Sequence, residues 1–155
     1  MKIQRSIERE VERKWRPELK PSTDESMMRA INPAGQSIPQ PSQAMLVSGD
    51  NLLFISGQVA YGTEGVIGTD LETQLDEAFK NLRTVLHEAG ATFENVARLT
   101  LYVVDYDQSM LSTIRSVRGR YINMERPPAS TLLGVSALFL PGVLVEVEAV
   151  AAIPR

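Results

Sequence analysis

Apolar residues recur at helical spacing over two segments of the chain. The first follows Thr69, which forms a capping box with Glu72, and continues until Gly90 ends it; its stripe consists of Leu71, Leu75, Ala78, Leu82, Val85, Leu86 and Ala89. The second can be capped by Asp107 or Ser109 and carries Met110, Leu111, Ile114, Val117 and Tyr121. Both segments predict helices with one apolar face.

Shorter segments rich in β-branched and apolar residues predict strands between and around these helices. Met45–Val47 and Leu52–Ser56 flank Ser48–Asn51, a turn sequence that predicts an opening hairpin. The other predicted strands are a short piece at Val66–Ile67, then Ala97–Val104, Ser130–Ser136 and Val143–Ala151. The order ββ(β)αβαββ predicts an α+β domain with a single sheet and both helices on one face. Because an apolar sheet face is rarely left in water, we expect self-association.

The first 41 residues differ from the rest of the chain. Residues 3 to 16 place Ile3, Ile7, Val11 and Trp15 four apart, which predicts a short amphipathic helix. Four prolines, Pro41 included, then follow among polar residues between Lys20 and Pro41, a composition typical of an extended linker. We therefore divide the chain into an N-terminal segment, 1–41, and a folded domain, 42–155. The N-terminal helix is either an arm that docks on a partner subunit or a frayed tail.

Composition excludes several kinds of chemistry. The chain has no cysteine and one histidine, so it offers no disulfide, thiolate nucleophile or histidine metal cluster. Neither a secretory signal nor a membrane-spanning apolar run is present, and we expect a cytoplasmic protein. Residues 1 to 20 carry seven Lys/Arg against four Asp/Glu, whereas the remainder carries nine against fifteen. An acidic body repels phosphate backbones, so we expect no nucleic-acid partner.

Three motifs in the domain carry a resemblance to a known family. They are Ile55-Ser56-Gly57-Gln58, Pro128-Ala129-Ser130-Thr131 and Val145-Glu146-Val147-Glu148-Ala149. In their order and spacing, from Ser42 to Ala152, the chain resembles the Rid/YjgF (RidA-like) family of imine and enamine deaminases. The resemblance implies a chorismate-mutase-like fold assembled as a homotrimer, with a cleft at each subunit interface and no metal or organic cofactor.

The family's site residues are partly retained. Its water-positioning glutamate corresponds to Glu146, and its cleft serine to Ser56. The arginine that pairs with the substrate carboxylate in the deaminases corresponds to Ser130, the family tyrosine to Pro41, and a helix asparagine falls near Arg115. Since a serine hydroxyl cannot replace a guanidinium fork, a standard 2-imino acid should bind poorly.

Each candidate residue also has a plain structural interpretation. Glu146 and Glu148 stand two apart on a strand and share a face, so they could simply form its wet side. The two helix arginines, Arg115 and Arg118, could supply the missing cation or form a solvated basic face. Gly57 could offer a backbone amide to a ligand or simply belong to a strand ending in a turn.

The side chains of Ser130, Thr131 and His87 likewise allow a functional and a plain structural interpretation. Ser130 and Thr131 could donate hydrogen bonds to a ligand, or be ordinary strand residues; no base near them in sequence supports a serine nucleophile. His87 lies beside the apolar stripe of the first helix, a position typical of a surface residue.

We interpret the chain as a RidA-like hydrolase of non-standard specificity. Glu146 would orient a water molecule for addition to a carbon–nitrogen double bond of a small metabolite. Ser56, Gly57, Ser130 and Thr131 would contact that ligand, and Arg115 or Arg118 would offer charge. The alternatives are a non-catalytic trimer that binds metabolites or protein partners, and a ribonuclease or translation-inhibitor activity. The acidic body and the lack of an acid–base histidine pair argue against the ribonuclease alternative.

Overall fold

A computed structural model describes residues 28–31, 42, 44–47 and 51–153. Its helices are α2 (Leu71–Glu88) and α3 (Leu111–Arg118), with short 3₁₀ turns η1 (Phe93–Asn95) and η2 (Gln108–Met110). Its strands are β1 (Met28–Ile31), β2 (Ala44–Val47), β3 (Asn51–Gln58), β4 (Tyr61–Gly62), β5 (Gly65–Val66), β6 (Val96–Val104), β7 (Ala129–Val135) and β8 (Val145–Ile153).

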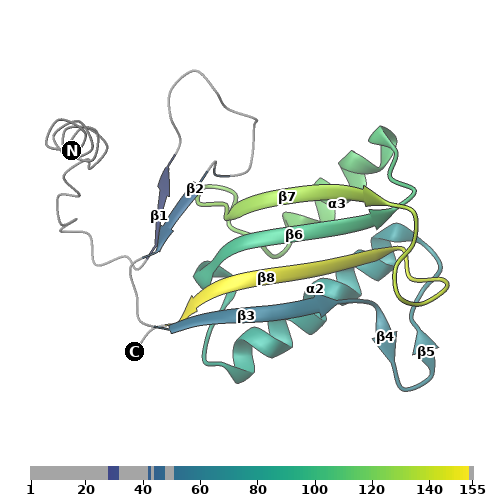
Figure 1. Cartoon of the computed structure of the whole chain (residues 1–155), viewed down its shortest axis with the longest axis horizontal. Coiled ribbons are helices and arrows are strands. Elements are labelled where there is room, and N and C mark those ends of the chain that lie inside the picture. Colours follow the sequence, from purple (N-terminus) through teal and green to yellow (C-terminus); the bar gives the residue numbers. More distant parts are fainter. Residues whose placement is uncertain (1–27, 32–41, 43, 48–50, 154–155) are drawn as a thin grey trace, which may run out of the picture.

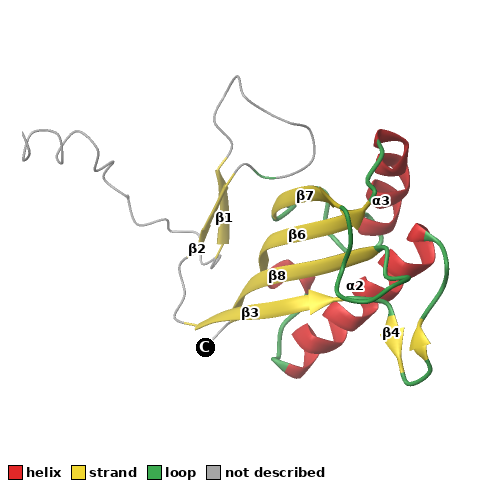
Figure 2. Ribbon diagram, turned by 45° about the vertical axis from the view of Figure 1, so that its right-hand side comes forward, coloured by secondary structure: helices red, strands yellow, loops and turns green. Residues whose placement is uncertain are grey.

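The main sheet has the strand order β3-β8-β6-β7, and both helices cover the same face of it (Figures 1 and 2). β8 pairs antiparallel with β3 and with β6, whereas β6 and β7 run parallel. Alternate residues of the two central strands point into the core between sheet and helices: Leu99, Leu101 and Val103 of β6, and Val145, Val147, Ala149 and Ala151 of β8. The predicted α+β class, with one sheet and both helices on one face, is confirmed.

Local signals at the two ends of α2 agree with the sequence to within one residue, whereas α3 ends at Arg118, before the predicted Tyr121. The N-cap of α2 is Asp70 rather than Thr69, and its carboxylate accepts a hydrogen bond from the Thr73 amide at 2.9 Å. Gly90 follows the helix with φ +72°, the left-handed conformation that glycine adopts without strain. Asp107 caps η2, which leads directly into α3.

The predicted opening hairpin is wrong in its pairing. Strands form on both sides of the turn sequence, but β2 pairs with β1 and β3 pairs with β8. Among the described residues β2 and β3 share no register. A turn sequence permits a hairpin, but a strand pairs where the pairing buries apolar surface. For β3, the strand β8 is a longer and more buried partner than β2.

The β1–β2 ribbon lies at one end of the main sheet. Met28 is buried against Ala97 and Ala152. β1 lies within the stretch that the sequence analysis interprets as a linker. Its four residues, set among prolines and polar residues, are too few to show the two-residue alternation that identifies a strand. The predicted N-terminal helix at residues 3 to 16 lies outside the described residues, as does Pro41.

A buried glutamine fastens the loop before β8 to helix α2. The Gln74 side-chain amide donates to the carbonyl oxygens of Gly68 and Gly142, at 3.1 and 2.8 Å. Its oxygen accepts from the Leu144 amide at 2.8 Å. Since Leu144 directly precedes β8, these bonds help to set the position of that strand. In the described ranges, neither helix combines the length and apolarity needed to cross a bilayer.

Candidate functional site

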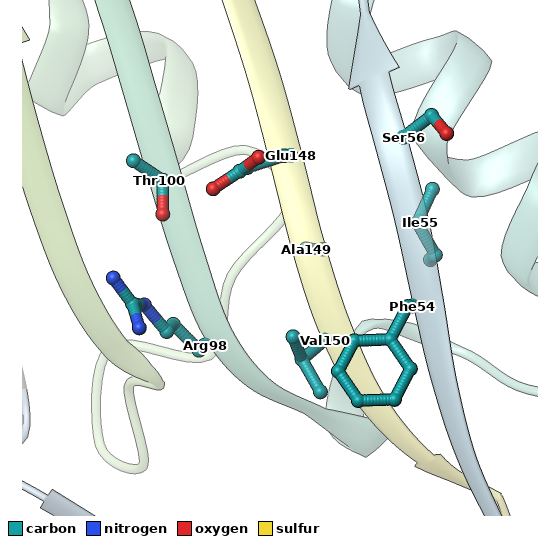
Figure 3. Close-up of a pocket in the computed structure, with 8 residues that line it drawn as sticks. All are labelled: Phe54, Ile55, Ser56, Arg98, Thr100, Glu148, Ala149 and Val150. Atoms are coloured by element: carbon teal, nitrogen blue, oxygen red, sulfur yellow. The ribbon is translucent and has the colours of Figure 1, made fainter.

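The sheet surface opposite the helices, here called the open face, collects polar side chains from three strands. Residues of β8 that alternate with the core residues point to it, namely Glu146, Glu148 and Val150. Their register partners on β6 are Tyr102, Thr100 and Arg98 in that order. Figure 3 shows Arg98, Thr100 and Glu148 on this side, with Phe54 and Ser56 of β3 across β8 from them. The candidate site is therefore built on a rigid sheet rather than on loops.

Glu146 lies directly over the backbone of Gly57. A Cβ atom built on Gly57 would be only 1.6 Å from Oε1 of Glu146, so any other residue would displace this carboxylate. Gly57 belongs to an irregular stretch of β3, because the register with β8 shifts between Ile55 and Gln58. This bulge brings Gly57 next to Glu146, whereas Ser56 lines a pocket together with Glu148.

The Glu146 carboxyl group holds its proton more tightly than an ordinary glutamate. Burial raises its pKa, and the negative charge of Glu148 raises the pKa further. Both causes disfavour the ionised form. Such a group can accept a proton from water and return it within one reaction, which is the behaviour of a general base.

Tyr102 holds Glu148 in place. Its hydroxyl donates a hydrogen bond to Oε1 of Glu148 at 3.1 Å. This bond, followed by burial and by the charges of Glu148 and Glu146, raises the pKa of Tyr102. The sequence analysis missed Tyr102 and Arg98, although their even spacing with Thr100 on one strand could have placed all three on the same face.

Ser130 and Thr131 do not share a face. Thr131 pairs with Thr100 and therefore points to the open face, whereas Ser130 pairs with Leu99, a core residue on the helix side. Within one protomer, the residue at the family's arginine position is thus separated from Glu146 by the sheet. Only Thr131 of this pair can share the open face with Glu146.

Arg115 and Arg118 lie on α3, on the helix side of the sheet. Arg115 is exposed, while burial and the charge of Arg115 lower the pKa of Arg118. Within one protomer, neither arginine lies on the face that carries Glu146. His87 is exposed in the last turn of α2. Within the described ranges no three acidic or histidine side chains are grouped as metal ligands would be.

Comparison with known proteins gives consistent matches over this domain. Residues 34–153 match the family model described as Endoribonuclease L-PSP. The chain is 33% identical over 112 residues to the RutC family protein YjgH of Escherichia coli, covering 72% of this chain and 82% of the relative. It is 30% identical over 112 residues to human 2-iminobutanoate/2-iminopropanoate deaminase, covering 71% and 77%.

The solved structures agree with the sequence matches. A protein of unknown function of the conserved Rid protein family, YyfB from Yersinia pestis, superposes with a TM-score of 0.76 at 36% identity. That match covers 83% of this chain and all of the other. The described domain therefore has the fold of these proteins.

Proposed function

The chain belongs to the endoribonuclease L-PSP family, the Rid/YjgF proteins, and from this membership and its site we propose that it hydrolyses small imines or enamines. The observation that carries the proposal is the Glu146 carboxylate, which packs against Gly57 and has a raised pKa. The human relative named as a 2-imino acid deaminase supports the same reaction class.

The chemistry requires one water molecule and one base. Ionised Glu146 accepts a hydrogen bond from the water and takes its proton as the water oxygen bonds to the imine carbon. The C=N electron pair moves to nitrogen, which takes up a proton from solvent. Glu146 then returns its proton to the amino nitrogen, and the hydroxyl proton passes to solvent. The C–N bond breaks, so that ammonia leaves and a carbonyl group forms. The products are one keto compound and one ammonia per imine and water consumed.

The remaining proposed contacts require a second protomer. Ser130, Arg115 and Arg118 lie on the helix side of the sheet, whereas Glu146 and Ser56 lie on or beside the open face. One pocket can hold both groups only where two copies of the chain meet, with β7 of one near the open face of the other. A homotrimer, as the family resemblance implies, supplies such interfaces, and the exposed apolar side chains of the open face give it a driving force.

The test is ammonia release from imines generated in situ from several neutral and amine-bearing amino acids. Imines hydrolyse spontaneously, so rates are compared with the same mixture lacking the protein. We expect wild type to accelerate release and Glu146→Gln to lose about 10²–10⁴-fold of that acceleration, the contribution typical of a general base. Glu125→Gln, on an exposed loop, is the matched control and should retain the wild-type rate. Acceleration that survives in Glu146→Gln would contradict the assigned role.

The loss of the family arginine favours one alternative, a trimer that binds metabolites or partners without catalysis. A carboxylate ligand would then bind while every imine in the panel hydrolyses at the background rate. Ribonuclease activity has no comparable support, because the open face carries two carboxylates that repel a phosphate backbone.

A further inference from the structure

One basic side chain stands out on the main sheet. Among the residues of β3, β6, β7 and β8, Arg98 is the only lysine or arginine. It pairs with Val150 of β8, on the open face that also carries Glu146 and Glu148. A guanidinium on this face is the complement of a carboxylate ligand.

Arg98 also lines a cavity. The pocket measures about 270 Å³ and is bounded by Arg98, Thr100, Glu148, Ser56, Phe54 and Val150. Figure 3 shows the guanidinium of Arg98 on the side of β6 away from β8, with Val150 and Phe54 on the other side of β6. The volume of the pocket suits a ligand of only a few heavy atoms. Such a ligand would place an ionic group at the wall that carries Arg98 and an apolar group at the wall that carries Phe54 and Val150.

The positive charge of Arg98 is available to a ligand. Glu148 is the acidic residue nearest to Arg98 along the open face. Its carboxylate accepts a hydrogen bond from Tyr102. Among the described residues the ion pairs join Lys80 and Arg120 to acidic side chains of α2, and none includes Arg98. The pocket therefore presents a guanidinium that no carboxylate of the described chain has neutralised.

The register also places Arg98 at a suitable separation from Glu146. Val150, the partner of Arg98, stands four positions after Glu146 on β8, or about 13 Å along the strand. An arginine side chain directed along the sheet shortens this gap. A ligand bound by Arg98, together with one water molecule, would have to span what remains of the gap to Glu146.

We propose that Arg98 binds the carboxylate of the substrate and takes the part that the arginine of the Pro-Ala-Arg-Ser/Thr motif plays in the deaminases. This assignment rests on the proposed function and replaces Arg115 and Arg118 as the source of charge. It also sets specificity. Because Glu146 and Glu148 share the face with Arg98, a second negative charge on the ligand is repelled, and monocarboxylates are preferred over dicarboxylates.

The experiment measures binding rather than turnover, so that it stands apart from the test of catalysis. Full-length protein is titrated with pyruvate, a monocarboxylate keto acid, and with 2-oxoglutarate, a dicarboxylate, by calorimetry or NMR. The variants are Arg98→Ala, Arg98→Lys and Arg115→Ala, which tests the rival source of charge. The matched control is Arg83→Ala, which removes an exposed arginine of α2 on the helix side of the sheet. Circular dichroism checks that each variant is folded.

We expect Arg98→Ala to weaken pyruvate binding about 10- to 100-fold, the range for a lost hydrogen bond to a charged group. Arg98→Lys should recover part of the affinity, Arg83→Ala should match wild type, and 2-oxoglutarate should bind wild type more weakly than pyruvate. Wild-type affinity in Arg98→Ala, no pyruvate binding by wild type, or a loss confined to Arg115→Ala would overturn the assignment. Arg98-dependent binding without accelerated ammonia release would instead contradict the proposed function and leave the Arg98 site intact.

Discussion

At the scale of single residues, the candidate site depends on Gly57 and Glu146. Any side chain at position 57 would overlap the Glu146 carboxylate, so the glycine is needed for contact rather than for an unusual φ angle. The same close packing removes water from Glu146, and burial is the larger cause of its raised pKa. The raised proton affinity of Glu146 thus follows from its packing against Gly57 in the bulge of β3.

The pH dependence of activity should report this environment. Only ionised Glu146 can accept the water proton, so kcat/KM should rise with pH through the pKa of Glu146, which is higher than the ordinary glutamate value. Glu148→Gln removes the second cause of the raised pKa and should move this rise to lower pH, while burial continues to raise the pKa. The other titratable groups near Glu146 are Tyr102 and, farther along β6, Arg98. The rate of ammonia release against pH measures the midpoint.

The raised pKa of Glu146 also determines whether the stability of the fold rises or falls with pH. Because the folded state raises the pKa of Glu146, protonation favours folding; this contribution is present below the ordinary glutamate pKa and is lost as pH rises through the raised value. At neutral pH, Glu146→Gln should therefore lose activity without losing stability. A midpoint that stays in place or rises in Glu148→Gln would contradict the assigned coupling, and Glu125→Gln should leave the profile unchanged.

At the scale of elements, the chain fastens β8 to α2 through polar atoms as well as through the core. Gln74 is fully buried and satisfies two carbonyl oxygens and one amide from two loops. Buried polar groups of this kind are stable only with all partners present. The helix thereby positions the strand that carries Glu146.

Gln74→Ala should lower the free energy of unfolding by about 2–4 kcal/mol, because it leaves Gly68, Gly142 and Leu144 with unsatisfied backbone groups. Urea denaturation followed by circular dichroism measures the change. Gln108→Ala, at an exposed glutamine, is the control and should stay within about 0.5 kcal/mol of wild type. Equal stability of the two variants would show that the Gln74 hydrogen bonds contribute little.

At the scale of the whole molecule, one sheet face is covered by helices and the other is left with exposed apolar side chains. Leu52 is 50% exposed, Phe54 74% and Leu133 41%, and all three belong to strands of the main sheet. Together with the separation of Ser130 from Glu146 by the sheet, this arrangement supports a site completed by neighbouring copies.

Light scattering coupled to size-exclusion chromatography should give three times the mass of one chain. Leu52→Glu places a charge on the open face and should shift the protein toward the single-chain mass with unchanged circular dichroism. Ile67→Glu, at a partly exposed apolar residue beside the small β4–β5 ribbon, should keep the wild-type mass. A wild-type protein with the mass of one chain would remove the basis for an interfacial pocket.

Much of the fold could be predicted from the sequence because its signals are local. The helical stripe from Leu71 to Ala89 and the strand segments each depend on residues within one element, and so does the alternation of Val145, Glu146, Val147 and Glu148. The helix cap was misplaced by one residue, because Thr69 and Asp70 both carry capping side chains. The motif carrying Glu146 was likewise visible in a single strand.

Strand partners, shared faces and the surroundings of each charge were decided only by the tertiary structure. The turn sequence before β3 suggested a hairpin, yet β3 pairs with β8, and only that pairing brings Gly57 to Glu146. Ser130 and Thr131, adjacent in sequence, point to opposite faces, while Arg98 and Glu146, far apart in sequence, share one. Local periodicity is encoded within a few residues, whereas register depends on which distant surfaces exclude water together.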